Sequence, residues 1–256
     1  MAYENIVYEK KDRIATVTFN RPEYLNASSP GINADRAAVF EEMAHDDDVL
    51  VTILTGAGRA FSAGAFIRDP KTHALDSAAE GVMRSGGGGF PWDYPKPLIG
   101  AINGPAYGAG LNLVLCCDII IASTEARFCF PMARLGIIPA WPGAPTLALF
   151  VGKAKAAEMT LMARPIDGED AYRWGLANKV VPPNELMDEA RAWAQEIAAL
   201  APISTRLIKD DLRDSFEGHF NRSGNRLRAM AAQLTEDRAE GHAAWREKRA
   251  PVFKGR

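Results

Sequence analysis

One stretch of this sequence, at residues 98–110, has residue types and a spacing that could support chemistry. In it, small residues directly follow an apolar run. Residues 98–102 predict a buried strand, residues 103–105 a tight turn, and Gly108, Ala109 and Gly110 the first turn of a helix. The first N–H groups of a helix have no acceptor inside it, so they can donate to an incoming oxygen. The stretch therefore predicts a site for an anion or a polarised carbonyl.

A second stretch has the same design. Residues 51–56 form a continuous apolar, β-branched run that predicts a strand buried on both faces, and the small residues of AFSAGAF follow at 60–66. Two such junctions could each aim one backbone N–H at the same oxygen. For either junction alone, small residues that merely permit tight turns and close packing explain the pattern as well.

These two stretches, with NRPEYLNA at 20–27 and FCFPMARLGIIPAWPGAPTL at 128–147, resemble the crotonase superfamily, also called the enoyl-CoA hydratase/isomerase family. The similarity runs nearly from end to end, from IATVTFNRP at 14–22 to EKRAPVFKG at 247–255. The resemblance implies an α/β fold in which residues 1–195 form a crotonase-like, right-handed spiral of ββα units with an acyl-CoA site. Residues 196–256 are then a helical C-terminal region that completes a trimer.

The resemblance also implies catalytic positions. The N–H groups of Ala65 and Ala109 match the two donors of the family's oxyanion hole, and Asn112 and Met132 stand where hydratases carry two glutamates. Trp141, nearby in the sequence, is a further candidate and supplies no acid. An amide can orient a water or a carbonyl but cannot take a proton at neutral pH, and a thioether does neither well. We therefore expect efficient hydration by two glutamates to be absent.

Binding of the CoA moiety is implied at three places. The resemblance assigns the adenine to the backbone at Ala63 and Gly64, and a phosphate to Arg59. The remaining candidates are Arg21 and Tyr24 at the edge of the CoA moiety, and Phe253 and Lys254, which match positions that reach the nucleotide, sometimes that of a neighbouring subunit. For Arg21, a turn with a solvated arginine explains the sequence as well.

A replacement acid or base could lie between residues 67 and 94, where the sequence has no clear periodicity and contains four consecutive glycines. The ionisable candidates are Asp69, His73, Asp93 and Tyr94. For each one, an exposed side chain without a chemical role is the alternative.

Composition agrees with a single large domain or a domain with an appendage. The chain has 256 residues, of which 47% are hydrophobic and 24% charged, and a formal net charge of −2, which provides no basic field for nucleic acid. Cys116, Cys117 and Cys129 lack metal-ligand spacing and indicate small core residues in a reducing compartment. The sequence has no apolar signal region and no membrane-spanning run, so we expect a soluble, cytoplasmic protein. We expect no metal and no cofactor, with coenzyme A as part of the substrate.

Hydrophobic spacing predicts further elements. A hairpin is expected over residues 3–19, and helices over 35–45, 153–162 and 186–200. Another helix begins at Pro202 with Leu207, Ile208 and Leu212 facing inward, and a last one covers 221–245.

Three functions remain open at this point. One is an enzyme that handles an acyl-CoA through its enolate with an unusual or relocated acid or base, in decarboxylation, C–C bond cleavage, isomerisation or hydration. The second is an acyl-CoA-binding protein without chemistry, and the third is a structural subunit of an assembly. The expected assembly of the chain itself is a homotrimer or a hexamer.

Overall fold

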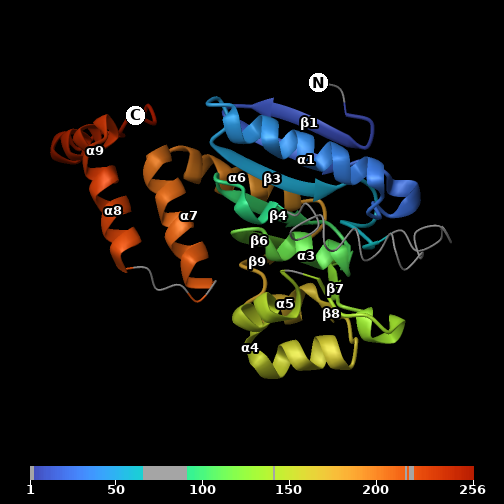
Figure 1. Ribbon diagram of the computed structural model, residues 1–256. Coiled ribbons are helices and arrows are strands. Elements are labelled where there is room, and N and C mark those ends of the chain that lie inside the picture. Colours follow the sequence, from blue (N-terminus) through green and yellow to red (C-terminus); the bar gives the residue numbers. More distant parts are fainter. Residues whose placement is uncertain (1–2, 66–90, 141, 217, 219–221) are drawn as a thin grey trace.

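Two β-sheets organise the chain in a computed structural model, which describes residues 3–65, 91–140, 142–216, 218 and 222–256. The larger sheet has the strand order β1-β2-β3-β4-β6-β9, and only β1 runs antiparallel to its neighbour. Its strands are β1 Ile6–Lys11, β2 Ile14–Phe19, β3 Val51–Gly56, β4 Leu98–Ile102, β6 Ile119–Ser123 and β9 Lys179–Val181. A small sheet joins β5 Pro105–Tyr107, β7 Arg127–Cys129 and β8 Ile166–Asp167 (Figure 1).

The chain alternates between these sheets in the manner expected for a ββα spiral. Strand β4 in the large sheet leads to β5 in the small one and then to helix α3, Ala109–Leu115. Strand β6 leads in the same way to β7 and then, after the short 3-10 helix η4, Met132–Leu135, to α4, Gly143–Leu161. The α/β spiral that the resemblance implied is therefore confirmed.

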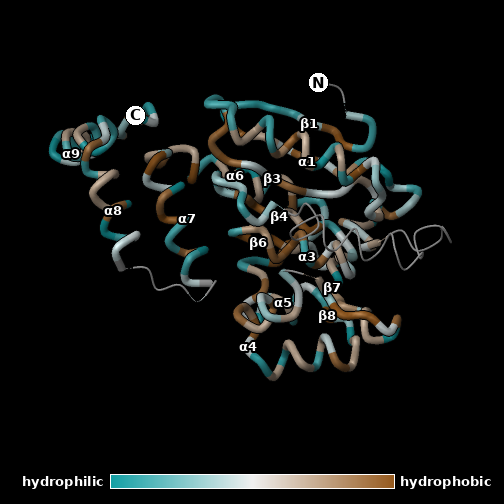
Figure 2. The backbone as a smooth tube through the Cα atoms, in the orientation of Figure 1, coloured by the Kyte–Doolittle hydropathy of each residue, from teal (hydrophilic) through white to brown (hydrophobic). Residues whose placement is uncertain are grey.

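Helices cover both faces of the large sheet because its central strands are apolar on both sides. In β3, Leu54 packs with the core that contains α1, Pro30–His45, and α3, whereas Val51 and Ile53 pack with α6, Leu186–Ala198. Figure 2 shows the hydrophobic colour concentrated along β4 and β6, while the edge strand β1 is mostly hydrophilic. The continuous apolar runs thus form doubly buried strands, as predicted.

The remaining helices lie at the periphery. They are α5 Gly168–Arg173, α7 Pro202–Phe216, α8 Arg222–Gln233 and α9 Glu236–Glu247. Figure 1 shows α8 and α9 beside α7, away from both sheets. The predicted division at residue 195 falls within α6 and stays a prediction. No helix in the described part of the chain is long and apolar enough to cross a membrane.

Three predicted helices have different bounds. The helix expected from residue 35 begins at Pro30, because the Ser29 hydroxyl accepts the N–H of Ile32 and proline suits the first helical position. The helix expected from residue 153 begins at Gly143 and kinks at Gly152, where φ is +75°. The helix expected over 221–245 is two helices, since Thr235 caps α9 by accepting the N–H of Arg238.

The predicted inward face of α7 is also wrong. Ile208 is 59% exposed and Leu212 57% exposed, Leu207 is half-buried, and Lys209 is buried instead. The Lys209 ammonium donates to the carbonyl oxygen of Lys96 at 2.8 Å and pairs with Asp118 at 2.8 Å. Polar contacts therefore fix the orientation of α7 on the core, against the apolar periodicity.

Lys96 is fully buried, and its side chain caps the carboxyl end of helix α1. Its ammonium donates to the carbonyl oxygens of Met43 and Asp46 at 2.5 and 2.7 Å. Both carbonyls lie at the carboxyl end of α1, where the helix supplies no further N–H donors. Burial lowers the pKa of Lys96 to about 8. This side chain joins α1 to the start of β4.

We expect Lys96→Met to lower the free energy of unfolding by about 1–3 kcal/mol, because the carbonyl oxygens of Met43 and Asp46 each lose a hydrogen bond worth roughly 0.5–1.5 kcal/mol and keep only a backbone N–H as donor. Urea denaturation followed by circular dichroism measures the change. The exposed Lys11, at the end of β1, provides the control Lys11→Met.

The stability difference should also depend on pH. Lysine in the unfolded chain has a pKa of about 10.4, so between about pH 8 and 10 the unfolded state binds more protons at this position. The contribution of Lys96 to stability therefore rises with pH, and the gap between the wild type and Lys96→Met should widen. A gap under about 0.5 kcal/mol, as for surface substitutions, or one that narrows with pH would contradict this role.

Candidate active site

The loops that follow β3 and β4 meet at the carboxyl edge of the large sheet. Because the two strands are parallel, both loops leave from the same edge. Ser62 and Ala106 then form a parallel bridge, in which the N–H of Ser62 donates to Pro105 at 3.0 Å and the N–H of Tyr107 donates to Ser62 at 2.9 Å. The strand pairing thus continues into the loops and fixes their relative position.

Two glycines allow the backbones to touch. A Cβ on Gly64 would lie 2.5 Å from the carbonyl oxygen of Tyr107 and 3.3 Å from the nitrogen of Ala109, and φ of Gly64 is +88°. A Cβ on Gly110 would lie 2.3 Å from the carbonyl oxygen of Ser62. Any side chain at these positions would push the loops apart.

Ala65 and Ala109 are thereby brought to neighbouring points of this junction. Ala109 is the first residue of α3, and the N–H of Ser28 holds the loop before Ala65 by donating to Gly64 at 2.7 Å. Among the described residues, none accepts a hydrogen bond from the N–H of Ala65 or Ala109. Two unsatisfied donors on adjacent backbone segments can hold one oxygen that carries negative charge.

Met132 lies beside this junction. Its Cε is 3.3 Å, and its Sδ 3.9 Å, from the place where a Cβ on Gly108 would stand. An apolar thioether therefore occupies one side of the pair of donors.

Asn112 is buried one turn into α3, and both ends of its amide are used. Its Nδ2 donates to the carbonyl oxygen of Ala140 at 3.2 Å, and its Oδ1 accepts the N–H of Gly143 at 3.1 Å. The side chain thus holds the turn that leads into α4. Trp141 lies outside the described residues.

The candidates for a relocated acid or base are not brought to the junction where the structure describes them. Tyr94 is buried and hydrogen-bonds Thr52 at 2.8 Å, near the amino end of β3, and burial raises its pKa above the ordinary value. The Asp93 side chain is 90% exposed and lies 3.7 Å from Arg213. Asp69 and His73 lie outside the described residues.

The predicted edge of the CoA site is assembled around the two loops. The guanidinium of Arg21 stacks on the ring of Tyr24 at 4.4 Å and donates to Ser29 at 3.3 Å. The N–H of Ala63 donates to the carbonyl oxygen of Leu25 at 2.9 Å, which ties this segment to the loop of Gly64. Arg59 is exposed on the same loop.

Asn26 is the residue that sequence reasoning missed in this region. It is buried with a φ of +53°, and its Nδ2 donates to the carbonyl oxygens of Ala57 and Ala60 at 2.9 and 2.8 Å. Asparagine tolerates the left-handed region and bonds backbone groups locally. The sequence signal that could have identified Asn26 is its position directly after the turn sequence RPEYL.

Phe253 and Lys254 lie elsewhere in this chain. The N–H of Lys254 donates to Asp237 at 2.6 Å, and Phe253 lies beside Gly241 in α9. Figure 1 shows the C-terminus and α9 on the opposite side of the molecule from β7 and β8. A role in CoA binding for these two residues stays a prediction that requires another copy of the chain.

The site contains backbone donors and no described metal-binding group. Within the described ranges, three His, Cys, Asp or Glu side chains nowhere come together to hold a metal ion. Burial raises the pKa of the Cys116 and Cys117 thiols, which keeps them neutral.

Comparisons with known proteins identify relatives of nearly the whole chain. The family model for enoyl-CoA hydratase/isomerase matches residues 9–256. A probable enoyl-CoA hydratase of Mycobacterium bovis is 34% identical over 255 residues, covering 99% of both chains. The (E)-benzylidenesuccinyl-CoA hydratase of Thauera aromatica is 35% identical over 260 residues, covering 98% of this chain and 99% of that one.

A solved structure has the same fold. The crystal structure of enoyl-CoA hydratase from Bacillus anthracis superposes with a TM-score of 0.93 at 30% identity, covering 99% of this chain and 100% of that one. Sequence and fold agree over the whole chain. The protein therefore belongs to the enoyl-CoA hydratase/isomerase family, the crotonase superfamily.

Proposed function

We propose that the protein binds an acyl-CoA and stabilises the enolate of its thioester between the N–H groups of Ala65 and Ala109. The observation that supports this is the contact at Gly64, which brings together two N–H groups that have no acceptor among the described residues. As a proton or carbon group leaves the α-carbon, negative charge develops on the thioester oxygen. Loss of one donor in such a site typically costs about 3 kcal/mol of barrier.

We further propose that the reaction does not use two glutamates. Asn112 and Met132 replace both, and Asn112 already uses its amide to hold the turn at Ala140 and Gly143. General acid and base groups typically contribute about 10²–10⁴-fold, whereas the oxyanion hole does not depend on them. Enolate chemistry with an atypical acid or base fits this site. The candidate reactions are decarboxylation, isomerisation, C–C bond cleavage and hydration. Hydration is the activity in the names of two of the relatives.

A catalytically silent acyl-CoA-binding protein is the second candidate. It is favoured by the side chains at the junction, because the Met132 thioether and the buried Asn112 amide cannot exchange a proton with substrate. The two candidates share the oxyanion hole and differ only in turnover.

The first test is Ala109→Pro. Proline is accepted at the first position of a helix but has no N–H, so this variant removes one donor with little change to the fold. We expect turnover of an enoyl-, β-keto- or malonyl-type CoA to fall about 10²–10³-fold, measured by mass-resolved assay. For a silent protein, the thermal stabilisation by acyl-CoA should be lost instead.

The matched control is Ala109→Gly, which keeps the N–H and should keep the activity or binding. Normal turnover or binding in a folded Ala109→Pro protein would rule out the oxyanion assignment. Melting temperatures of both variants report on folding.

The second test installs an acid without disturbing Asn112. Met132→Glu places a carboxyl group beside Gly108 and should raise the rate of crotonyl-CoA hydration at least about 10-fold, because a general base contributes 10²–10⁴-fold in favourable geometry. Met132→Gln has similar size and no basic oxygen, and should give no gain. Equal rates in the two variants would mean that Met132 does not face the reacting carbon.

A homotrimer or a hexamer is the assembly we propose. Large apolar side chains stay exposed on α8 and α9 in the single chain: Leu227, Met230 and Trp245. Contact with a second copy would bury them and could bring Phe253 and Lys254 to a neighbouring CoA site. Native mass spectrometry should give the mass of three or six chains; a monomer at micromolar concentration would contradict the proposal.

A further inference from the structure

A cavity of about 110 Å³ lies at the carboxyl end of α3. Its wall is formed by α3, α4, α7 and the short 3-10 helix η3, Pro91–Asp93. Trp92, Leu115, Phe150 and Leu212 supply the large apolar side chains, and Lys209, Arg213 and Asp118 the charged ones. The residues assigned to the oxyanion hole and the CoA edge do not line this cavity.

The cavity and the oxyanion hole lie along the same helix. Ala109 begins α3 and Cys116, which lines the cavity, caps its end. Seven residues at 1.5 Å each place them about 10 Å apart. Asn112 and Cys116 share one face of α3 because they are four residues apart. An extended acyl group of that length could join the two places.

Helix α4 follows the same course. Gly143, at its start, is held by Asn112 near the oxyanion hole, and Phe150, seven residues later, lines the cavity. The two helices that frame the junction therefore also frame the cavity. This common frame places the cavity within the reach of an acyl group held at the junction.

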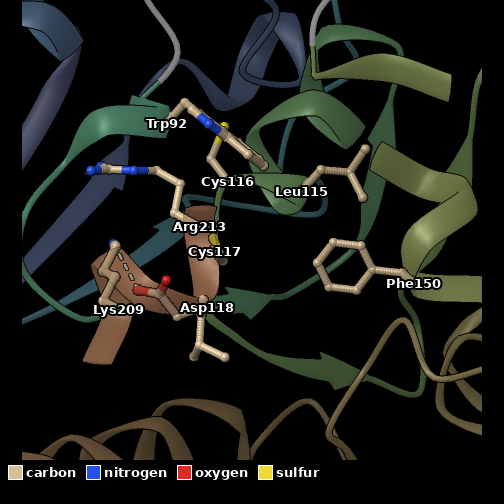
Figure 3. A pocket seen from close by; sticks show the side chains of 9 residues that line it. Trp92, Leu115, Cys116, Cys117, Asp118, Phe150, Lys209 and Arg213 are labelled. Carbon is tan, nitrogen blue, oxygen red and sulfur yellow. Dashed lines mark ion pairs between the residues drawn. The ribbon is translucent and has the colours of Figure 1, made fainter. Parts of the chain in front are cut away.

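The lining favours an uncharged, apolar occupant. Figure 3 shows Leu115 and Phe150 on one side of the cavity, with Lys209 and Asp118 as an ion pair on another. Arg213 is also paired, with Asp210 at 2.9 Å. Because both cations of the lining already hold carboxylates, a charged end of a ligand would gain little and would have to lose its hydration.

We infer that this cavity receives the distal end of the acyl group, and that this end carries an aromatic ring. The inference rests on the proposed acyl-CoA function. A ring fits between aromatic and aliphatic walls in edge or offset contacts with Trp92 and Phe150. A cavity of about 150 Å³ suffices to bind benzene in another protein, so this one, open at its mouth, has the right order of size.

The test compares four CoA thioesters by calorimetry on the full-length protein. They are acetyl-CoA, octanoyl-CoA, octanedioyl-CoA with a second carboxylate, and 5-phenylpentanoyl-CoA. We expect the phenyl compound to bind at least about 10-fold more tightly than acetyl-CoA and more tightly than octanoyl-CoA, through edge and offset contacts of the ring with the aromatic walls. Octanedioyl-CoA should bind more weakly than octanoyl-CoA.

Leu212→Trp fills the mouth of the cavity from an exposed position on α7, so that folding should be unaffected. It should remove the preference for the phenyl compound and leave acetyl-CoA binding unchanged. Ile208→Trp is the matched control, because Ile208 is equally exposed on the same helix, at 59% against 57%, and does not line the cavity. It should change none of the four affinities.

Three results would overturn the inference while acyl-CoA binding remains. They are octanoyl-CoA binding as tightly as the phenyl compound, an unchanged preference in Leu212→Trp, and a change of oligomeric state in that variant with all four affinities intact. The last would identify the cavity as a contact between subunits. If none of the four compounds binds the wild type, the proposed function itself fails, and this inference fails with it.

Discussion

The contact between two backbone segments at Gly64 is the constraint on which the rest of the structure depends. With the Cβ position of Gly64 only 2.5 Å from the carbonyl oxygen of Tyr107, the loops after β3 and β4 can meet only if neither strand slips in register. The Ser62–Ala106 bridge and the Asn26 amide hold this approach from two sides. The large sheet, apolar on both faces, supplies the rigidity that such short distances require.

The opposite edge of the sheet is held by charge instead of by close packing. Asp118 accepts the N–H of Leu98 at the start of β4 and pairs with Lys209, while Lys96 ends α1. Helix α3 spans the distance between the two edges. Its beginning is placed by backbone contacts and its end by an ion pair. The depth of the space beside it is therefore fixed at both ends.

Much of the fold could be predicted because continuous apolar runs such as β3 and β4 have few alternatives. Periodicity alone missed the start of α1 at Pro30 and the break at Thr235, where caps decide. It also placed Ile208 and Leu212 inward. The residue that faces the core is Lys209, and hydrophobic periodicity cannot detect a lysine that is buried because it hydrogen-bonds a distant backbone carbonyl. The positions of the two N–H donors, Ala65 and Ala109, were predicted only from the resemblance to the family. The role of Asn112 could not be predicted, since its partners are backbone atoms 28 and 31 residues away.

The engaged amide of Asn112 has a consequence for how such a site can change during evolution. A carboxylate at this position could not donate to Ala140, and its charge would lie against that carbonyl oxygen, so the turn before α4 would have to rearrange. Position 132 has no such commitment, since the described structure shows only packing of the Met132 side chain. Acquisition of acidic residues is therefore ordered: the change at 132 is accessible at once, whereas the change at 112 requires a prior alteration of the turn.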